Sequence, residues 1–333
     1  MRKVLRYALL LLVVLAAAVW LNNTSIFSPP SQARPTLLAH RGVAQTFPHD
    51  GVDAETCTAT RIYPPEHSYI ENTLPSMRAA FDAGADVVEF DIHPTTDGQF
   101  AVFHDWTLDC RTDGKGVTRE HTLAELKTLD AGFGYTADGG KTFPLRGKGV
   151  GMIPSLDEVL AAFPGKRFLI HVKSNDAGEG EQLAAYLAKL APEQRKRLIV
   201  YGGTPPVDLV HRRLPAVAAG SKRALKECLV RYLAIGWSGH VPEACRSGLM
   251  LVPSNIAPWL WGWPDKFLDR MQRAGVQVFV LGPYDGGQFS SGVDDLAALA
   301  ELPEHFAGGI WTNRIDRIGP AVQSKQAPEP IVP

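Results

Sequence analysis

The chain has 333 residues, 45% of them hydrophobic, and a formal net charge of −1 at pH 7. This length and composition are enough to bury a full hydrophobic core, and a charge near zero gives no electrostatic bias toward nucleic acid, so we expect no nucleic-acid partner. The simplest organisation is one domain, for which a barrel is the commonest architecture at this size.

The first 34 residues differ in composition from the rest. Three basic residues precede an uncharged apolar run at 7–21, and a polar, proline-containing stretch follows. This pattern is typical of an export signal or a membrane anchor. The run is shorter than a full span of about 20 residues, which favours a cleaved signal, but no clean cleavage site follows it directly, which favours an uncleaved anchor. We expect an exported domain that is periplasmic, held in the inner membrane through this segment, or secreted.

Export would place the four cysteines in an oxidising compartment, where disulfides form. Cys228 and Cys245 lie close in sequence around a loop that contains glycine and proline, and Cys57 and Cys110 both lie in predicted loops. Four cysteines permit three pairings, and free thiols are the alternative. We expect Cys228 to pair with Cys245 and Cys57 with Cys110.

Helix and strand patterns alternate along residues 35–320. A short apolar strand ends in the sequence His-Arg-Gly at 40–42, and a long loop at 43–70 separates it from a helix that begins after Glu-Asn-Thr at 71–73. A second long, glycine-rich loop lies at 132–154. The strand candidates are 36–40, 87–93, 100–103, 167–173, 198–203, 216–220, 249–253, 276–281 and 309–312.

Alternation of strands and helices predicts a TIM (β/α)8 barrel with long loop insertions over residues 35–320. Nine strand candidates are one more than such a barrel needs, so we expect that either 216–220 or 249–253 is not a barrel strand. Residues 321–333 are low in complexity, and we expect them to form a disordered tail.

Polar side chains collect where the predicted strands end, and in a barrel these ends converge on one mouth. Taken singly, each has a structural interpretation, such as a satisfied core histidine or an ion pair between Arg41 and Glu71. Together they are more than a core tolerates without a function, so we expect a site there. The residues are His40, Arg41, Glu89, Asp91, His104, His171 and Lys173.

The residue types at this mouth suit phosphodiester cleavage. Glu89 and Asp91 lie on one face of a strand, where two carboxylates can hold a hard divalent cation. Two histidines from different strands can act as base and acid, and fixed cations can stabilise an anion. A glycosidase is disfavoured, because carboxylates so close on one strand cannot flank a sugar from two sides.

The order LLAHRG, ENTLPSMRAAFDAGADVVEFDIHPTTDGQFAVFHD and GGIWTNRIDR resembles the glycerophosphodiester phosphodiesterases, from Leu37 to about Arg317. The resemblance implies a TIM barrel that hydrolyses glycerophosphodiesters to glycerol 3-phosphate and an alcohol. It implies that His40 and His104 are the acid/base pair, and that the glycerol 2-hydroxyl attacks phosphorus to give a cyclic phosphate. Glu89 and Asp91 would bind Ca²⁺ or Mg²⁺. The other residues expected at the site are Arg41 and Lys173 as catalytic cations, and Glu71, Asn72, His93 and Trp311 in support or substrate contact.

One position departs from the family pattern. Members carry Glu as a third metal ligand in an E-x-K strand, whereas this chain has His171-Val172-Lys173. Imidazole is a softer ligand than carboxylate, which predicts a metal preference shifted toward Mn²⁺, Zn²⁺ or Fe²⁺. Alternatively His171 does not ligate, and water or Glu71 takes the place.

Other interpretations remain open at this level. The enzyme alternative is a phospholipase D-like phosphodiesterase that acts on phospholipid headgroups, and the non-enzyme alternative is a catalytically silent barrel that binds phosphodiesters. The loop at 43–70 is either a lid on the mouth or only a disulfide-tied loop. Trp259, Trp261 and Trp263 either contact lipid or pack within their loop. Neither the alcohol moiety nor the oligomeric state is indicated.

Overall fold

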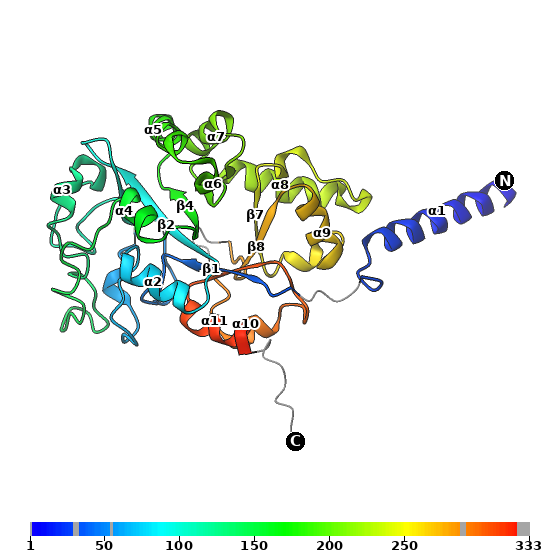
Figure 1. The fold of residues 1–333 in the computed structure, drawn as a ribbon. Helices are drawn as coiled ribbons and strands as arrows, with labels where there is room; N and C mark the ends of the chain where they lie inside the picture. The colour runs from blue at the N-terminus through cyan, green and yellow to red at the C-terminus, as the bar shows by residue number, and fades with distance from the viewer. Residues whose placement is uncertain (1, 29–32, 54–55, 287–290, 325–333) are drawn as a thin grey trace, which may run out of the picture.

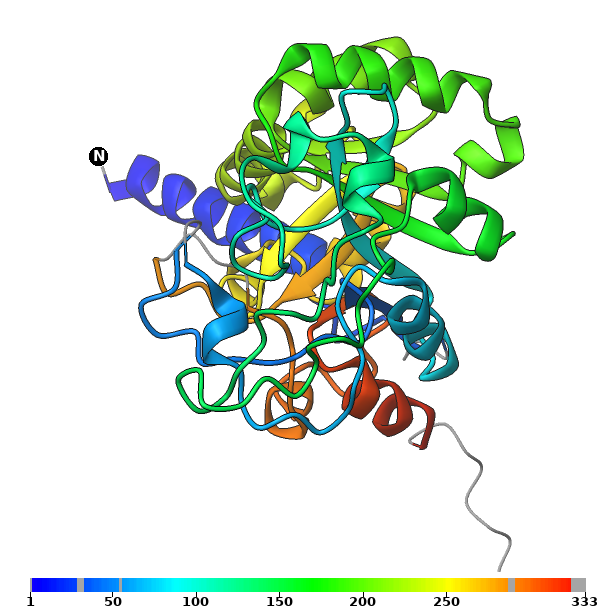
Figure 2. The ribbon, with the colours of Figure 1, turned by 90° about the vertical axis from the view of Figure 1, so that its left-hand side faces the viewer.

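The computed structural model describes residues 2–28, 33–53, 56–286 and 291–324 (Figures 1 and 2). Eight parallel strands form a nearly closed barrel in the order β6-β5-β4-β2-β1-β9-β8-β7. Their bounds are β1 (Thr36–His40), β2 (Val87–Pro94), β4 (Arg167–Val172), β5 (Leu198–Gly202), β6 (Ala218–Ser221), β7 (Leu249–Pro253), β8 (Gln277–Leu281) and β9 (Gly309–Thr312). The predicted TIM barrel is confirmed.

The expectation about the extra strand was wrong. Both 216–220 and 249–253 contribute barrel strands, β6 and β7, and the strand outside the barrel is β3 (Phe100–Val102), which pairs antiparallel with β2. A tight turn at Thr95–Gln99, with Gly98 at φ 75°, folds β3 back onto β2. Parallel neighbours need a long crossover, so a strand that follows so short a turn extends β2 as a hairpin instead.

β6 and β7 form the seam of the barrel. No ladder joins them in the part of the chain that the structure describes, but the Ala219 N–H donates to the carbonyl of Ser247, 2.7 Å away and just before β7.

The helices surround the strands (Figure 2). The α-helices of the barrel are α2 (Leu74–Asp82), α3 (Leu123–Leu126), α4 (Leu156–Ala162), α5 (Ala177–Lys189), α6 (Pro192–Arg195), α7 (Thr204–Arg213), α8 (Lys222–Ile235), α9 (Asp265–Arg273), α10 (Leu296–Ala300) and α11 (Ile315–Ser324).

Alternation along β2 separates two environments. Val88, Phe90 and Ile92 pack outward into the main core between the barrel and its helices, and Val87 packs inward with side chains from other strands. Because side chains alternate along a strand, Glu89 and Asp91 share the inward face with Val87, nearer the carboxyl end. The barrel interior is therefore apolar at its amino end and charged at its carboxyl end.

The long loop at 43–70 packs against the rest of the molecule. Its residues Ala59, Ile62 and Ile70 belong to a second cluster of buried apolar side chains with β3 and α3. A disulfide between Cys57 and Cys110 ties the loop to the segment after β3, and Cys228 in α8 is bonded to Cys245. Both expected pairings are confirmed.

The two ends of the chain differ from the expectations. Helix α1 (Arg2–Asn23) has 22 residues and is long and apolar enough to cross a membrane, so it exceeds the predicted apolar run. At the other end α11 continues past Pro320 to Ser324, because Ile315, Ile318 and Val322 bury one face of the helix. The expected tail therefore starts at least four residues too early, and its remainder, 325–333, lies outside the described residues.

Candidate active site

Adjacent strands deliver the polar side chains at the same level of the barrel mouth. The register pairs His40 of β1 with Glu89 of β2, and Asp91 of β2 with His171 of β4. Lys173 directly follows β4. Strand ends on one rim thus bring together residues that lie far apart in the sequence.

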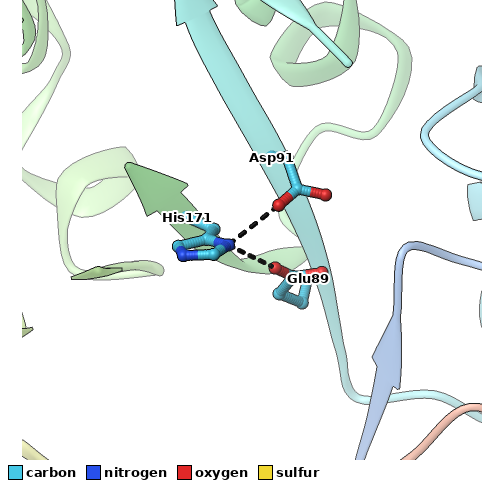
Figure 3. A group of neighbouring side chains, drawn as sticks. All are labelled: Glu89, Asp91 and His171. Atoms are coloured by element: carbon cyan, nitrogen blue, oxygen red, sulfur yellow. Dashed lines mark hydrogen bonds and ion pairs between the residues drawn. The ribbon is translucent and has the colours of Figure 1, made fainter. Parts of the chain in front are cut away.

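Glu89, Asp91 and His171 converge as a group (Figure 3). One ligand atom from each lies within 4.8 Å of the others, and Nδ1 of His171 is 2.8 Å from Asp91 Oδ1 and 3.7 Å from Glu89 Oε1. The Tyr201 hydroxyl donates to Glu89 Oε1 over 2.7 Å, and its ring stacks on His171 with 4.3 Å between centroids. The structure thus brings together the three predicted metal ligands and adds Tyr201.

The two buried carboxylates differ in protonation. Burial and then the charge of Asp91 raise the pKa of Glu89 to about 8. Burial acts on Asp91 in the same direction, but Lys173, His104 and Arg41 outweigh it and hold the pKa of Asp91 well below its usual range. Burial lowers the pKa of His171 to about 3, so its ring is neutral at pH 7. Two crowded carboxylates beside a neutral imidazole fit a divalent cation, which would relieve the repulsion between them.

His40 is held in one tautomer. Its Nδ1 lies 2.6 Å from Asn313 Oδ1, and the Asn313 amide nitrogen donates to Asp294 Oδ2 over 2.8 Å, which fixes the orientation of the amide. Nδ1 must therefore carry the proton, and the free Nε2 lies 3.7 Å from Glu89 Oε2. Burial and then the charge of Arg41 lower the pKa of His40 well below its usual value. This ring is a neutral base at pH 7.

His104 follows β3 and reaches the same group from another side. Its Nδ1 is 2.6 Å from Asp105 Oδ1, and its Nε2 accepts from Lys173 Nζ over 2.9 Å. Lys173 is in turn 3.5 Å from Asp91 Oδ1. Burial, Arg41 and Lys173 lower the pKa of His104 to about 4.

Residues 40–198 match the Glycerophosphoryl diester phosphodiesterase family. This segment of the chain carries the sequence of that family. A glycerophosphodiester phosphodiesterase from Bacillus subtilis (strain 168) is 40% identical over 134 residues, which are 38% of this chain and 42% of the relative. The chain thus spans about two fifths of the length of this curated relative.

Solved structures of the family share the fold. The glycerophosphoryl diester phosphodiesterase domain of an uncharacterized Mycobacterium tuberculosis protein has a TM-score of 0.60 at 16% identity, over 88% of this chain and 99% of that one. A phosphodiesterase from Oleispira antarctica in complex with the product sn-glycerol-3-phosphate has a TM-score of 0.54 at 20% identity, over 87% of this chain and 96% of that one. At these identities the likeness shows the fold alone.

The predicted supporting residues all lie beside these groups. Asn72 donates to Asp91 Oδ2 over 3.0 Å, and Asn72 and Arg41 both adopt a left-handed backbone, each at φ 61°. His93 Nε2 donates to the carbonyl of His104 over 3.3 Å, and the Trp311 ring lies 4.9 Å from the His40 ring. Strained non-glycine backbone of this kind persists only where surrounding contacts fix it.

A buried ion-pair network connects the two sides of the site. Glu71 accepts from Arg41 over 2.9 Å and from Arg111 over 3.0 Å, and Arg111 Nε lies 2.9 Å from Asp105 Oδ2. Burial opposes ionisation of Glu71, but Arg111 and Arg41 outweigh it and lower its pKa. The network therefore fixes Arg41 on one side and the Asp105 partner of His104 on the other.

Sequence reasoning missed several residues of this site. Tyr201 shares the inward face of β5 with Ile199, and strand periodicity would have pointed to it. Asp105 directly follows His104 in the FHD motif, and Asn313 follows β9 in the same way that Arg41 follows β1. Arg111 gave no signal, because its partners come from three separate loops.

The loop at 43–70 lines a cavity of about 450 Å³ at the mouth. His40 and Arg41 form its inner end, and Phe47, Tyr63 and Glu66 contribute from the loop. The loop is tied down by a disulfide, as one of its two interpretations expected, and it borders the mouth, whereas its role as a lid stays a prediction. The residues on the facing side are Asp294, Asp295, Asn313, Arg314 and Arg317.

We predict that Arg111→Met lowers the free energy of unfolding by about 3–5 kcal/mol, because it leaves Glu71 and Asp105 as buried carboxylates without this partner. Urea unfolding followed by circular dichroism measures the loss. Arg246→Met is the control, since Arg246 pairs with Glu243 on the exposed surface, where ion pairs contribute about 0–1 kcal/mol. Equal losses in both variants would contradict the stabilising role of the network.

Proposed function

We propose that this protein hydrolyses glycerophosphodiesters to glycerol 3-phosphate and an alcohol in a metal-dependent reaction. The observation that supports the proposal is that His40 and His104 each contact the Glu89–Asp91 pair, one directly and one through Lys173. The family match and the glycerol 3-phosphate bound by the Oleispira relative support this substrate class.

His40 serves as the base in the proposed reaction. The glycerol 2-hydroxyl oxygen bonds to phosphorus while its proton passes to Nε2 of His40, whose tautomer Asn313 fixes. A neutral ring whose Nδ1 is hydrogen-bonded to Asn313 is suited to accept a proton on Nε2. Arg41 and Lys173 stabilise the negative charge that builds on the phosphate oxygens.

His104 serves as the acid. As the phosphorus–oxygen bond to the alcohol breaks, the alcohol oxygen takes a proton from Nε2 of His104, and Asp105 stabilises the charged ring. A phosphate anion bound between Arg41 and Lys173 takes the hydrogen bond that Lys173 donates to Nε2 of His104 and offsets both positive charges, so Nε2 can carry a proton. Water then opens the cyclic phosphate with the two proton transfers reversed, and glycerol 3-phosphate leaves.

A divalent cation would be held by Glu89, Asp91 and His171. When bound, such a cation would polarise the phosphate oxygens as a Lewis acid. Two carboxylates match Ca²⁺ or Mg²⁺, as in the family, whereas the imidazole of His171 favours Mn²⁺, Zn²⁺ or Fe²⁺.

We also propose that the barrel works outside the cytoplasm. An apolar helix at the amino terminus is compatible with a signal or an anchor. Two disulfides support a periplasmic or secreted location, because such bonds persist in oxidising compartments.

The roles of the two histidines can be separated by the leaving group. With glycerophosphocholine, His40→Ala and His104→Ala should each lower kcat/KM about 10²–10⁴-fold. With glycerol phosphoryl-4-nitrophenol, whose leaving group needs no proton, His104→Ala should lose far less activity than His40→Ala. Release of glycerol 3-phosphate and of 4-nitrophenol measures both. Wild-type kcat/KM in both variants would contradict the proposed function. If His104→Ala lost as much activity as His40→Ala on both substrates, the assignment of acid and base would be wrong.

The metal preference is tested by His171→Glu. We expect the wild-type protein to bind Co²⁺ with visible absorption bands of a nitrogen-containing site, and the variant to lose these bands and gain affinity for Ca²⁺. Titrations of both proteins, monitored by absorption and by calorimetry, measure the change. Unchanged Co²⁺ bands in the variant would show that His171 does not ligate.

The disulfide between Cys57 and Cys110 flanks the network, because Thr58 beside one cysteine accepts from Arg111 beside the other over 2.6 Å. We predict that Cys57→Ala with Cys110→Ala lowers kcat on glycerophosphocholine at a temperature where the variant is folded. Cys228→Ala with Cys245→Ala is the matched control, with a comparable stability loss of roughly 3–4 kcal/mol in the loop-entropy estimate and unchanged kcat. Equal kcat in both variants would contradict the link from disulfide to site.

A further inference from the structure

The carboxyl end of α1 is hydrogen-bonded to the flank of the barrel. The side chain of Asn23 donates to the Trp237 carbonyl over 2.8 Å, and that of Asn22 donates to the same oxygen over 3.1 Å. Trp237 lies in η3 (Gly236–Ser238), the turn that follows α8. Figure 1 shows α1 projecting away from the barrel on the side of α8 and α9.

Arg270 of α9 is the buried centre of this attachment. It is only 7% exposed, and it donates to the Asn22 carbonyl over 2.7 Å and to Asn23 Oδ1 over 2.9 Å. It also donates to the carbonyl of Gly236 over 3.2 Å. Removal of α1 would take two acceptors from a buried guanidinium, which is unfavourable. Cleavage of α1 as an export signal would remove both of these hydrogen-bond acceptors from Arg270.

Large apolar side chains are exposed around this attachment. Trp237 is 42% exposed, Trp261 is 36% exposed and Trp259 is 77% exposed. The Trp261 carbonyl accepts from Arg270 and from Tyr232, which places this loop beside the end of α1. Immediately after α1, Ile26 and Phe27 are also exposed. We call Phe27, Trp237, Trp259 and Trp261 the aromatic patch.

A lipid bilayer is the occupant that fits this patch. At about 1.5 Å per residue the 22 residues of α1 span roughly 33 Å, which matches a hydrocarbon core of about 30 Å. The helix ends in Asn22 and Asn23, so the membrane surface would lie at the level of these residues. Tryptophan is enriched at that level, because its ring is apolar and its N–H is polar.

We propose that α1 is retained as an uncleaved anchor and that the aromatic patch of the barrel rests in the interface of the same bilayer. The anchor is then a rigid mount and not a flexible tether, because Arg270, Asn22 and Asn23 fix it to α9 and η3. Of the three tryptophans of 259–263, Trp263 packs against Phe267 and Phe306, whereas Trp259 and Trp261 face outward for lipid contact.

Tryptophan quenching by brominated lipid tests the contact. The full chain carrying Trp20→Phe, which removes the signal of α1, is reconstituted in phosphatidylcholine vesicles with bromine either high on the acyl chain or near the bilayer centre. We expect stronger quenching by the high bromine, and loss of that quenching when Trp237, Trp259 and Trp261 are also changed to Phe. Trp106→Phe is the control, because Trp106 is 44% exposed but lies beside His93 at the mouth, and its loss should leave the quenching in place.

Two outcomes overturn the proposal. Absence of quenching in the Trp20→Phe protein, or quenching that survives the triple replacement, would show that the patch does not contact lipid. Intact-mass measurement of the protein recovered from producing cells is expected to show residues 2–23 still attached. A mature chain that begins after Asn23 would show that α1 is a removed signal.

Discussion

The arrangement of this site depends on the electrostatic repulsion between two carboxylates that are buried side by side in the barrel. Glu89 and Asp91 are fully buried on one face of β2, where water cannot screen their repulsion. Arg41 and Lys173 form ion pairs with Asp91, whereas burial and then the charge of Asp91 raise the pKa of Glu89 to about 8. A divalent cation held by Glu89, Asp91 and His171 would also offset the repulsion between the two carboxylates.

The cations themselves depend on a second shell of charges. Arg41 would be a costly buried group without Glu71, and Glu71 would be costly without Arg111. Because Arg111 also holds Asp105, the orientation of His104 is tied to that of Arg41 through three intervening side chains. The loop at 43–70 contributes to this order, since Thr58 and the disulfide at Cys57 hold Arg111 from its far side.

Periodicity predicted the barrel and the polar groups at its mouth, and the family resemblance added Asn72, His93 and Trp311 to the proposed site residues, whose roles stay predictions. These signals are local: alternation along β2 marks the carboxylates, and glycine-containing turns mark the strand ends. Two kinds of feature were not visible. The strand β3 was counted as a candidate barrel strand because a short apolar run does not show whether the strand runs parallel or antiparallel to its neighbour. The role of Arg111 was not predicted because its partners come together only in the folded chain. The continuation of α11 past Pro320 likewise depends on tertiary burial of Val322.

The seam between β6 and β7 divides the barrel into unequal parts with different tasks. The segment from β1 to β6 carries most of the charged site, whereas β7, β8 and their helices carry the surface that meets α1. The β1–β9 ladder, the contact at the seam and the hydrogen bond from Arg167 of β4 to Gln277 of β8 join the two parts. The attachment of α1 and the reacting groups therefore draw on different strands of the barrel, so different substitutions can alter each of them.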